Sequence, residues 1–191
     1  FSFYGNKIVT TGEGGMITTD NKEFEQKAKM LRDHGMSQDK KYFHTVIGYN
    51  YRLTNLQAAV GVAQMEKINA ILQRKQEIAN LYAFLLQNVK GISLPPEATW
   101  AKNVYWMYTI LVDKEQYGFS RDDLMARLKE NGVDSRPIFY PITSMPPYKE
   151  NRLLPVAKKL AETGLCLPSG VGLKDEEIER VASLIANPGS K

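Results

Sequence analysis

The first sixteen residues constrain the fold of this chain more than any other stretch. The segment Phe1 to Lys7 is rich in aromatic residues and ends on a lysine, with Ser2 five positions before it. Two pairs that contain β-branched residues, Ile8-Val9 and Ile17-Thr18, flank the sequence Gly-Glu-Gly-Gly at 12–15. This pattern predicts a β-hairpin whose tight turn is supplied by the glycines.

A lysine that a hairpin holds in place suits imine chemistry with an aldehyde cofactor. An amine attacks an aldehyde only after it has lost its proton, so such a lysine needs a defined environment. The hydroxyl of Ser2 is placed to donate to an anionic group such as a phosphate. The alternatives are a solvated turn lysine, the commoner role of a lone lysine, and a serine bonded to the backbone.

The sequence Ser-Phe-Tyr-Gly-Asn-Lys at 2–7, followed by Thr-Gly-Glu-Gly-Gly-Met at 11–16, resembles the cofactor-lysine motif of the DegT–StrS family. The resemblance implies an α/β protein with an aspartate-aminotransferase-like fold (fold type I). It also implies a pyridoxal 5′-phosphate-dependent aminotransferase that acts on a nucleotide-linked keto sugar, with glutamate as amino donor, in the biosynthesis of amino sugars such as those of lipopolysaccharide O-antigen. In that family the lysine lies in mid-chain, so the resemblance covers the C-terminal half of such an enzyme.

The resemblance implies roles for particular residues. Lys7 would bind the cofactor as an imine and shuttle the proton, while Ser2 would bind its phosphate. The segment 48–53 resembles the family segment whose asparagine reaches the cofactor phosphate of the neighbouring subunit, so Asn50 takes that role and an obligate homodimer with shared active sites follows. Arg52 offers a forked cation for a carboxylate or phosphate. The alternative for Asn50 is a turn residue.

Two further residues resemble substrate-binding positions. The segment 135–141 resembles the family's substrate-facing strand, and Arg136 would meet the diphosphate of the nucleotide sugar. Many relatives carry a histidine a few residues on, where this chain has Thr143-Ser144; this form resembles the branch that makes GDP-perosamine. His34 matches a position near the mouth of the active site, with the C-cap of a helix as its alternative.

The resemblance divides the chain into the end of a cofactor-binding domain (1–53), a long interdomain helix (54–90) and a small C-terminal α/β domain (91–191). The helix begins with a capping box, Thr54 and Gln57, and would extend over roughly 50 Å. The polar stretch 73–77 predicts a bend or an exposed turn within it.

The remaining elements follow from capping residues and hydrophobic periodicity. Before the long helix we expect a helix from a cap at Asp20 or Asn21 to Asp33 and a long loop over 34–50 that is either functional or disordered. After it we expect a strand from Val104 to Val112, a helix capped by Ser120 that stops at Asn131-Gly132, and an extended segment from Val133 to Phe139. The chain then continues with a helix over 151–163, a buried strand from Gly164 to Leu167, and a last helix capped by Asp175.

Composition excludes several classes of function. The net charge is +4 and the isoelectric point is near 9.0, but lysines alternate with glutamates instead of forming the basic block of a nucleic-acid binder. The sequence has no apolar run of transmembrane length. The single cysteine, Cys166, has no disulfide partner, and the spacing of His34 and His44 fits no metal site. We therefore expect a cytoplasmic protein without a metal.

Alternatives within and outside the family stay open. They are a pyridoxal-dependent sugar dehydratase, a non-catalytic regulatory protein on the same scaffold, and a nucleic-acid binder. Dehydratase relatives replace the lysine, so Lys7 favours amino transfer. In the family, the acid that faces the pyridinium nitrogen and the aromatic residue over the ring precede the lysine. The start at Phe1 therefore favours a part of a longer protein, inactive alone.

Overall fold

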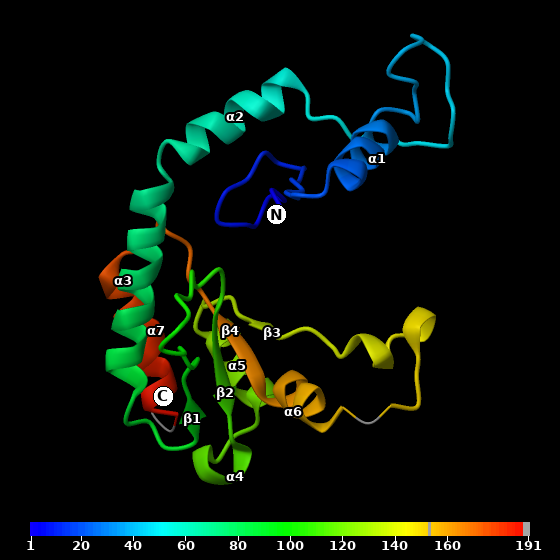
Figure 1. Ribbon diagram of the computed structural model, residues 1–191. Coiled ribbons are helices and arrows are strands. Elements are labelled where there is room, and N and C mark those ends of the chain that lie inside the picture. Colours follow the sequence, from blue (N-terminus) through cyan, green and yellow to red (C-terminus); the bar gives the residue numbers. More distant parts are fainter. Residues whose placement is uncertain (153, 189–191) are drawn as a thin grey trace. The chain divides into compact units, whose positions relative to one another are not determined.

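The computed structural model describes residues 1–152 and 154–188 and divides into two compact units, Phe1–Asn69 and Ala70–Lys191 (Figure 1). The first unit contains α1 (Lys22–Arg32) and α2 (Asn55–Met65). The elements that follow are α3 (Ile68–Leu86), β1 (Ile92–Ser93), β2 (Tyr108–Val112), α4 (Lys114–Tyr117), α5 (Arg121–Glu130), β3 (Arg136–Pro137), two 3₁₀ turns (Ile142–Ser144 and Pro146–Tyr148), α6 (Pro155–Thr163), β4 (Gly164–Leu167) and α7 (Asp175–Ala186).

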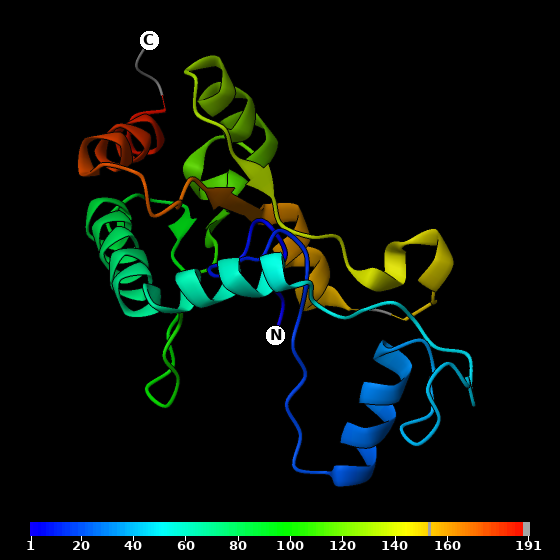
Figure 2. The same cartoon turned by 90° about the horizontal axis from the view of Figure 1, so that it is seen from above.

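The second unit is built on one antiparallel sheet with strand order β1-β2-β4-β3. In β2, Tyr108, Ile110 and Val112 are buried while the two residues between them are half-buried, as expected for a strand with two unequal faces. Figures 1 and 2 show α3 and α7 on one face of the sheet and α6 on the other. All four residues of β4 are buried, which confirms the predicted strand 164–167 and places Cys166 in the core.

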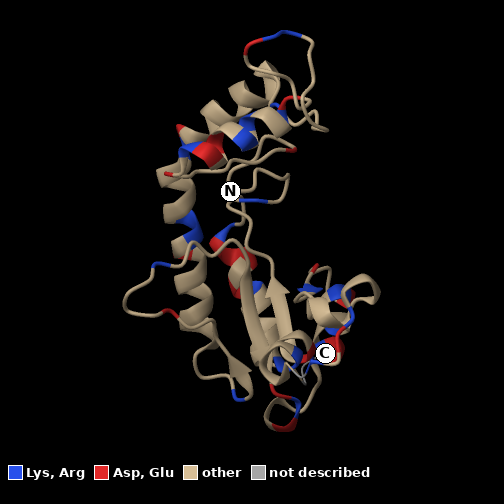
Figure 3. Ribbon diagram, turned by 45° about the vertical axis from the view of Figure 1, so that its right-hand side comes forward, with Lys and Arg blue, Asp and Glu red and all other residues tan. Residues whose placement is uncertain are grey.

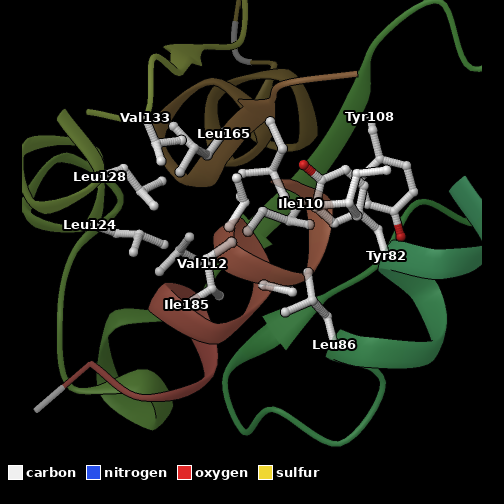
Figure 4. Packing of buried hydrophobic residues seen from close by; sticks show 14 of the residues in the cluster. Tyr82, Leu86, Tyr108, Ile110, Val112, Leu124, Leu128, Val133, Leu165 and Ile185 are labelled. Atoms are coloured by element: carbon white, nitrogen blue, oxygen red, sulfur yellow. The ribbon is translucent and has the colours of Figure 1, made fainter. Parts of the chain in front are cut away.

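The hydrophobic core lies between the sheet and the helices α3, α5 and α7 (Figure 4). The Tyr82 ring stacks on the Tyr108 ring at a centroid distance of 5.0 Å, and the Tyr82 hydroxyl donates to the carbonyl of Pro168 at 2.9 Å. The hydroxyl bond lets a polar aromatic side chain lie in an apolar core. The fully buried members include Tyr82, Leu86, Ile110, Leu128, Leu165, Ile178 and Ile185.

The prediction of one helix over 54–90 with a bend at 73–77 is wrong. The helix is interrupted at Glu66-Lys67, between α2 and α3, and residues 73–77 lie within regular α3. The polar stretch has partners instead of a bend: Arg74 forms ion pairs with Glu77 at 3.3 Å and with Asp175 of α7 at 2.8 Å. Whether 54–90 bridges two domains stays a prediction.

Several predicted boundaries also shift. The strand begins at Tyr108 and not at Val104, because Tyr105 has a positive φ of 46°, which an extended strand does not accommodate. Only Arg136–Pro137 of the extended segment 133–139 forms a strand, and the helix over 151–163 begins at Pro155. The N-cap of α7 is Lys174, one residue before the predicted Asp175.

Three predicted helix starts are confirmed. Asn21 caps α1 by accepting from the Phe24 amide at 3.0 Å. Ser120 begins α5 with a capping box that includes Asp123, and Thr54 begins α2 with one that includes Gln57. These signals lie within four residues of one another, so they act independently of the rest of the fold. The helix α5 ends at Asn131-Gly132, as predicted.

The charged residues of both signs are interspersed along the helices and loops (Figure 3). This distribution is typical of a solvated surface. Within residues 1–152 and 154–188, no helix is long and apolar enough to cross a membrane. The same residues contain no group of three or more histidine, cysteine, aspartate or glutamate side chains that could hold a metal ion.

Lys75 is a buried lysine of α3 whose side chain the sequence does not mark as special. Its ammonium group donates to the carbonyls of Trp106 and Ser169 at 3.1 and 2.6 Å and to the Ser169 hydroxyl at 3.1 Å. Only 5% of the residue is exposed, and burial lowers its pKa to about 8. Lys75 therefore ties α3 to the two loops that flank β2 and β4.

Replacing Lys75 with methionine is expected to lower the free energy of unfolding by about 1–3 kcal/mol, because two half-buried carbonyls lose their donor. Since the folded-state pKa is lowered from 10.5 to about 8, the unfolded chain binds more protons between these values. The contribution of Lys75 to the free energy of unfolding is thus fully present above pH 10.5 and declines as the pH falls toward 8. Urea unfolding of both forms across this range should show that the difference between their free energies of unfolding widens as the pH rises.

The control makes the same change at the exposed Lys90, which should leave the free energy of unfolding within about 0.5 kcal/mol of the wild-type value at every pH. An equal loss at Lys90 would contradict the stabilising role given to the hydrogen bonds of Lys75.

Candidate functional site

Lys7 lies in a loop that antiparallel backbone pairing closes. The Phe3 amide donates to the Gly14 carbonyl and the Met16 amide to the Phe1 carbonyl, both at 2.9 Å, around a bridge between Ser2 and Gly15. The predicted hairpin is therefore wrong in its register: the pairing encloses the lysine, whereas Ile8-Val9 do not form a strand. Pairing nearer the start of the chain places Lys7 within a closed loop, in a turn where the Lys7 amide donates to the Tyr4 carbonyl at 2.9 Å.

Two threonines hold the returning half of this loop. The Thr10 hydroxyl and the Thr11 amide both donate to the Phe3 carbonyl at 3.0 Å. Thr11 is buried, and its hydroxyl donates to the Glu13 carbonyl at 2.6 Å. A Cβ atom on Gly14, whose φ is 145°, would lie 2.8 Å from the Thr11 hydroxyl oxygen, so glycine is required there. Sequence reasoning missed both threonines because their partners are set by the loop closure.

Ser2 lies at the base of the same loop and is exposed. Its hydroxyl oxygen accepts from the Tyr4 amide at a long 3.4 Å. A hydroxyl that accepts one hydrogen bond can still donate its own hydrogen, which is what a phosphate oxygen requires. The structure thus places Ser2 at the base of the loop that carries Lys7, and their roles toward a cofactor stay predictions.

A second group of candidates surrounds Asp33, at the C-terminal end of α1. The Asp33 carboxylate lies 3.0 Å from Nδ1 of His34 and 3.3 Å from a guanidinium nitrogen of Arg52, and its backbone forms a bridge with Asn50. The hydrogen bond with His34, assisted by the charge of Arg52, holds the pKa of the Asp33 carboxyl below its usual range. Asp33 was not a predicted site residue, although it adjoins one. It joins three predicted residues in one cluster.

The loop 34–50 returns to α1 as an ordered hairpin-like segment. The His34 amide donates to the Tyr49 carbonyl at 2.8 Å, and the Tyr49 amide donates to the Leu31 carbonyl at 2.7 Å. His34 is not the C-cap that its alternative role predicts; Asp33 occupies that position and His34 follows it with a φ of 60°. The Tyr49 and Tyr51 rings stack at 5.1 Å. Backbone bonds therefore bring Asn50 beside Asp33.

Arg136 lies in the second unit, on the edge strand β3, where it pairs with Cys166 of β4. Its guanidinium is exposed and contacts the Met107 sulfur at 3.2 Å. The neighbouring Phe139 is exposed and stacks on Trp106 at 6.4 Å. An arginine beside aromatic surface suits a nucleotide ligand, and the role of Arg136 stays a prediction.

Solved structures share the fold of this chain. The structure of DesV from S. venezuelae in complex with a ketimine intermediate is 29% identical and superposes with a TM-score of 0.88 over 100% of this chain and 51% of its own. The predicted fold class, the C-terminal half of an aspartate-aminotransferase-like α/β protein, is thereby confirmed.

The sequence comparisons identify the family. The model of the DegT/DnrJ/EryC1/StrS aminotransferase family matches residues 1–186. A GDP-perosamine synthase from Caulobacter vibrioides is 38% identical over 97% of this chain and 50% of its own length. A putative pyridoxal phosphate-dependent aminotransferase, EpsN from Bacillus subtilis, is 32% identical over 97% and 48%. The chain belongs to the DegT/DnrJ/EryC1/StrS aminotransferase family, and it spans about half the length of these curated relatives.

Proposed function

We propose that the complete protein is a pyridoxal 5′-phosphate-dependent aminotransferase that converts a nucleotide-linked keto sugar into an amino sugar, with glutamate as donor. The observation that carries this proposal is the closed loop that presents Lys7, with the Ser2 hydroxyl at its base. The similarity to a GDP-perosamine synthase favours a GDP-linked sugar. The cytoplasm, where the Cys166 thiol would stay reduced, is the proposed compartment.

The residues of this chain fit the chemistry of that cofactor. A lysine amine bonds an aldehyde, and the hydroxyl of Ser2 and the side-chain amide of Asn50 are neutral donors for phosphate oxygens. Bound pyridoxal phosphate supplies an electron sink for loss of a proton from the amine-bearing carbon. The Lys7 amine would take that proton from the substrate carbon and deliver it to the adjoining carbon of the cofactor. The residues His34 and Arg52, oriented by Asp33, and Arg136 would bind the anionic substrates.

A shared active site is part of the proposal. Asn50 would serve the cofactor of the neighbouring subunit, so the working form is an obligate homodimer. In this chain Tyr42, Phe43, Tyr49 and Tyr51 are 51–75% exposed, so they do not cover its own core. Aromatic side chains that are exposed in a single subunit are typical of the surface that becomes the buried centre of an interface. Their exposure leaves them available for such an interface.

The test is to supply the complete protein with glutamate labelled with heavy nitrogen and a GDP-linked keto sugar. Transamination moves the amino group from glutamate, which becomes 2-oxoglutarate, to the sugar carbon that loses its carbonyl oxygen. Mass spectrometry should therefore find the heavy nitrogen in the sugar. A dehydratase would give a sugar that lacks a hydroxyl and carries no label, and this result would replace the proposal. A regulatory protein would leave both reactants unchanged.

A further inference from the structure

The carbonyl of Glu13 accepts two side-chain hydrogen bonds from different parts of the first unit. One comes from the Thr11 hydroxyl, at 2.6 Å, and lies within the loop that carries Lys7. The other comes from Nε2 of Gln57, at 3.3 Å, and arrives from the first turn of α2. Gln57 is thus a side chain that ties this loop to a helix.

The amide of Gln57 serves two purposes at once. Its oxygen accepts from the backbone amide and the hydroxyl of Thr54, at 3.0 and 3.2 Å, which completes the capping box of α2. Its nitrogen points the other way and donates to Glu13. Only an amide at this position both accepts from the cap and donates to the loop, since a carboxylate has no donor.

The packing around this bond is close on both sides. A Cβ atom on Gly61, one turn further along α2, would lie 3.0 Å from the Thr11 methyl carbon. A Cβ atom on Gly14 would lie 3.0 Å from a Leu53 methyl carbon. The loop therefore rests against α2 and the residue before its cap, so a bond at Glu13 acts on a segment that has little room to shift.

Glu13 adjoins the point at which the loop closes. The next carbonyl, of Gly14, accepts from the Phe3 amide, and the Phe3 carbonyl accepts from the Thr11 amide. The ten residues of the loop, Tyr4 to Glu13, are therefore bounded by Phe3 and Gly14. A donor that fixes Glu13 fixes this closure, and with it the backbone from which the Lys7 side chain extends.

We propose that Gln57 is a positioning residue: its side-chain amide holds the Lys7 loop against α2 and so sets where the Lys7 amine meets the cofactor. The second half of this statement rests on the proposed function; the first half does not. Gln57 acts through Glu13 and the loop closure, without contact with the cofactor.

The decisive variant is Gln57→Glu. A glutamate at the third helical position completes a capping box as well as glutamine does and adds a favourable charge at the helix start. It cannot donate to the Glu13 carbonyl. In the cofactor-free complete protein, hydrogen exchange at the Phe3 and Thr11 amides should therefore quicken roughly threefold to tenfold, the equivalent of one hydrogen bond. Exchange at the Ala58 amide, which bonds to Thr54 in α2, should stay unchanged.

Two controls separate the loop from the helix. Thr54→Ala removes the cap but leaves the Gln57 donor, so exchange should quicken at Ala58 and not at Phe3 or Thr11. Gln26→Glu makes the same chemical change on exposed α1 and should alter neither set. If Gln57→Glu leaves exchange at Phe3 and Thr11 at the wild-type rate, Gln57 does not hold the loop and the inference is wrong. Gln57→Met, which lacks the amide donor and the amide acceptor, should quicken exchange at Phe3 and Thr11 and also at Ala58, and so provides a second test of the loop contact.

The effect of Gln57 on the position of the Lys7 amine is measured separately, through the bound cofactor. With pyridoxal phosphate bound, Gln57→Glu should shift the pH at which the visible absorbance of the cofactor changes and should quicken cofactor loss several-fold, whereas Thr54→Ala should do neither. If the loop loosens but the absorbance titration is unchanged, Gln57 does not position the amine. If the wild-type protein binds no cofactor, the proposed function fails while the exchange experiment still decides whether Gln57 holds the loop.

Discussion

Replacing Lys7 with alanine in the complete protein is expected to abolish both covalent attachment of pyridoxal phosphate and transamination. The loop closed between Phe3 and Gly14 presents one lysine, and alanine offers no amine in its place. Loss of a group that both bonds the cofactor and moves the proton removes the chemistry itself, so the residual rate should be at background. The visible absorbance of the purified protein and a product assay measure the two losses.

Two variants show whether the amine or only the positive charge matters. Lys7→Arg keeps the charge, but a guanidinium stays protonated and does not bond an aldehyde, so this variant should be as inactive as the alanine form. Lys27→Ala removes an exposed lysine of α1 and should leave activity unchanged. Normal turnover by either Lys7 variant would remove this residue from the site.

Mixing two inactive forms of the complete protein is expected to restore activity. The first form carries Lys7→Ala; the second carries Asn50→Ala with Arg52→Ala, which removes a phosphate donor and a cation. If Asn50 serves the partner's cofactor and Arg52, two residues on, acts in the same site as Asn50, each mixed dimer contains one site with both defects and one site with neither. About half of the sites in mixed dimers should then work. Product formation after subunit exchange, compared with each form alone, measures this.

The expected size of each effect follows from the contacts. Asn50→Ala alone should cost about 1–3 kcal/mol of cofactor binding, as for one charge-assisted hydrogen bond, and leave the fold intact. The dimer interface is expected to bury more than about 2,000 Å². If mixed dimers are demonstrated by labelling and activity stays at background, the sites are not shared. In that case Asn50 is a turn residue beside Asp33.

Local signals in the sequence predicted local structure well. The capping boxes at Thr54 and Ser120 and the buried strand 164–167 are set by residues a few positions apart, and all three are present. The break at Glu66-Lys67 escaped prediction because no glycine or proline marks it. The hairpin register escaped prediction because the closing bonds join Phe1 to Met16 and Phe3 to Gly14, so that the glycines lie in the pairing and not in the turn.

In the candidate site, too, the residues of the local motif were predicted and those that depend on distant contacts were missed. The motif predicted Lys7 and Ser2 as a pair, and the structure places Ser2 at the base of the loop that carries Lys7. The roles of Asp33 and Gln57 depend on contacts with residues far along the chain, Arg52 and Glu13, which the sequence of either segment alone does not reveal. Lys75 lies in the polar stretch 73–77, and the sequence did not predict its burial because its three oxygen partners belong to Trp106 and Ser169, far along the chain.

The central claim is that Lys7 bonds the cofactor, and borohydride reduction of the complete wild-type protein with pyridoxal phosphate tests it most directly. Reduction makes the bond between cofactor and lysine permanent, and peptide mapping by mass spectrometry then identifies the lysine. The account predicts the added cofactor mass on the peptide that contains Lys7. Recovery of that mass on another lysine, or on none while the protein transaminates normally, would contradict it.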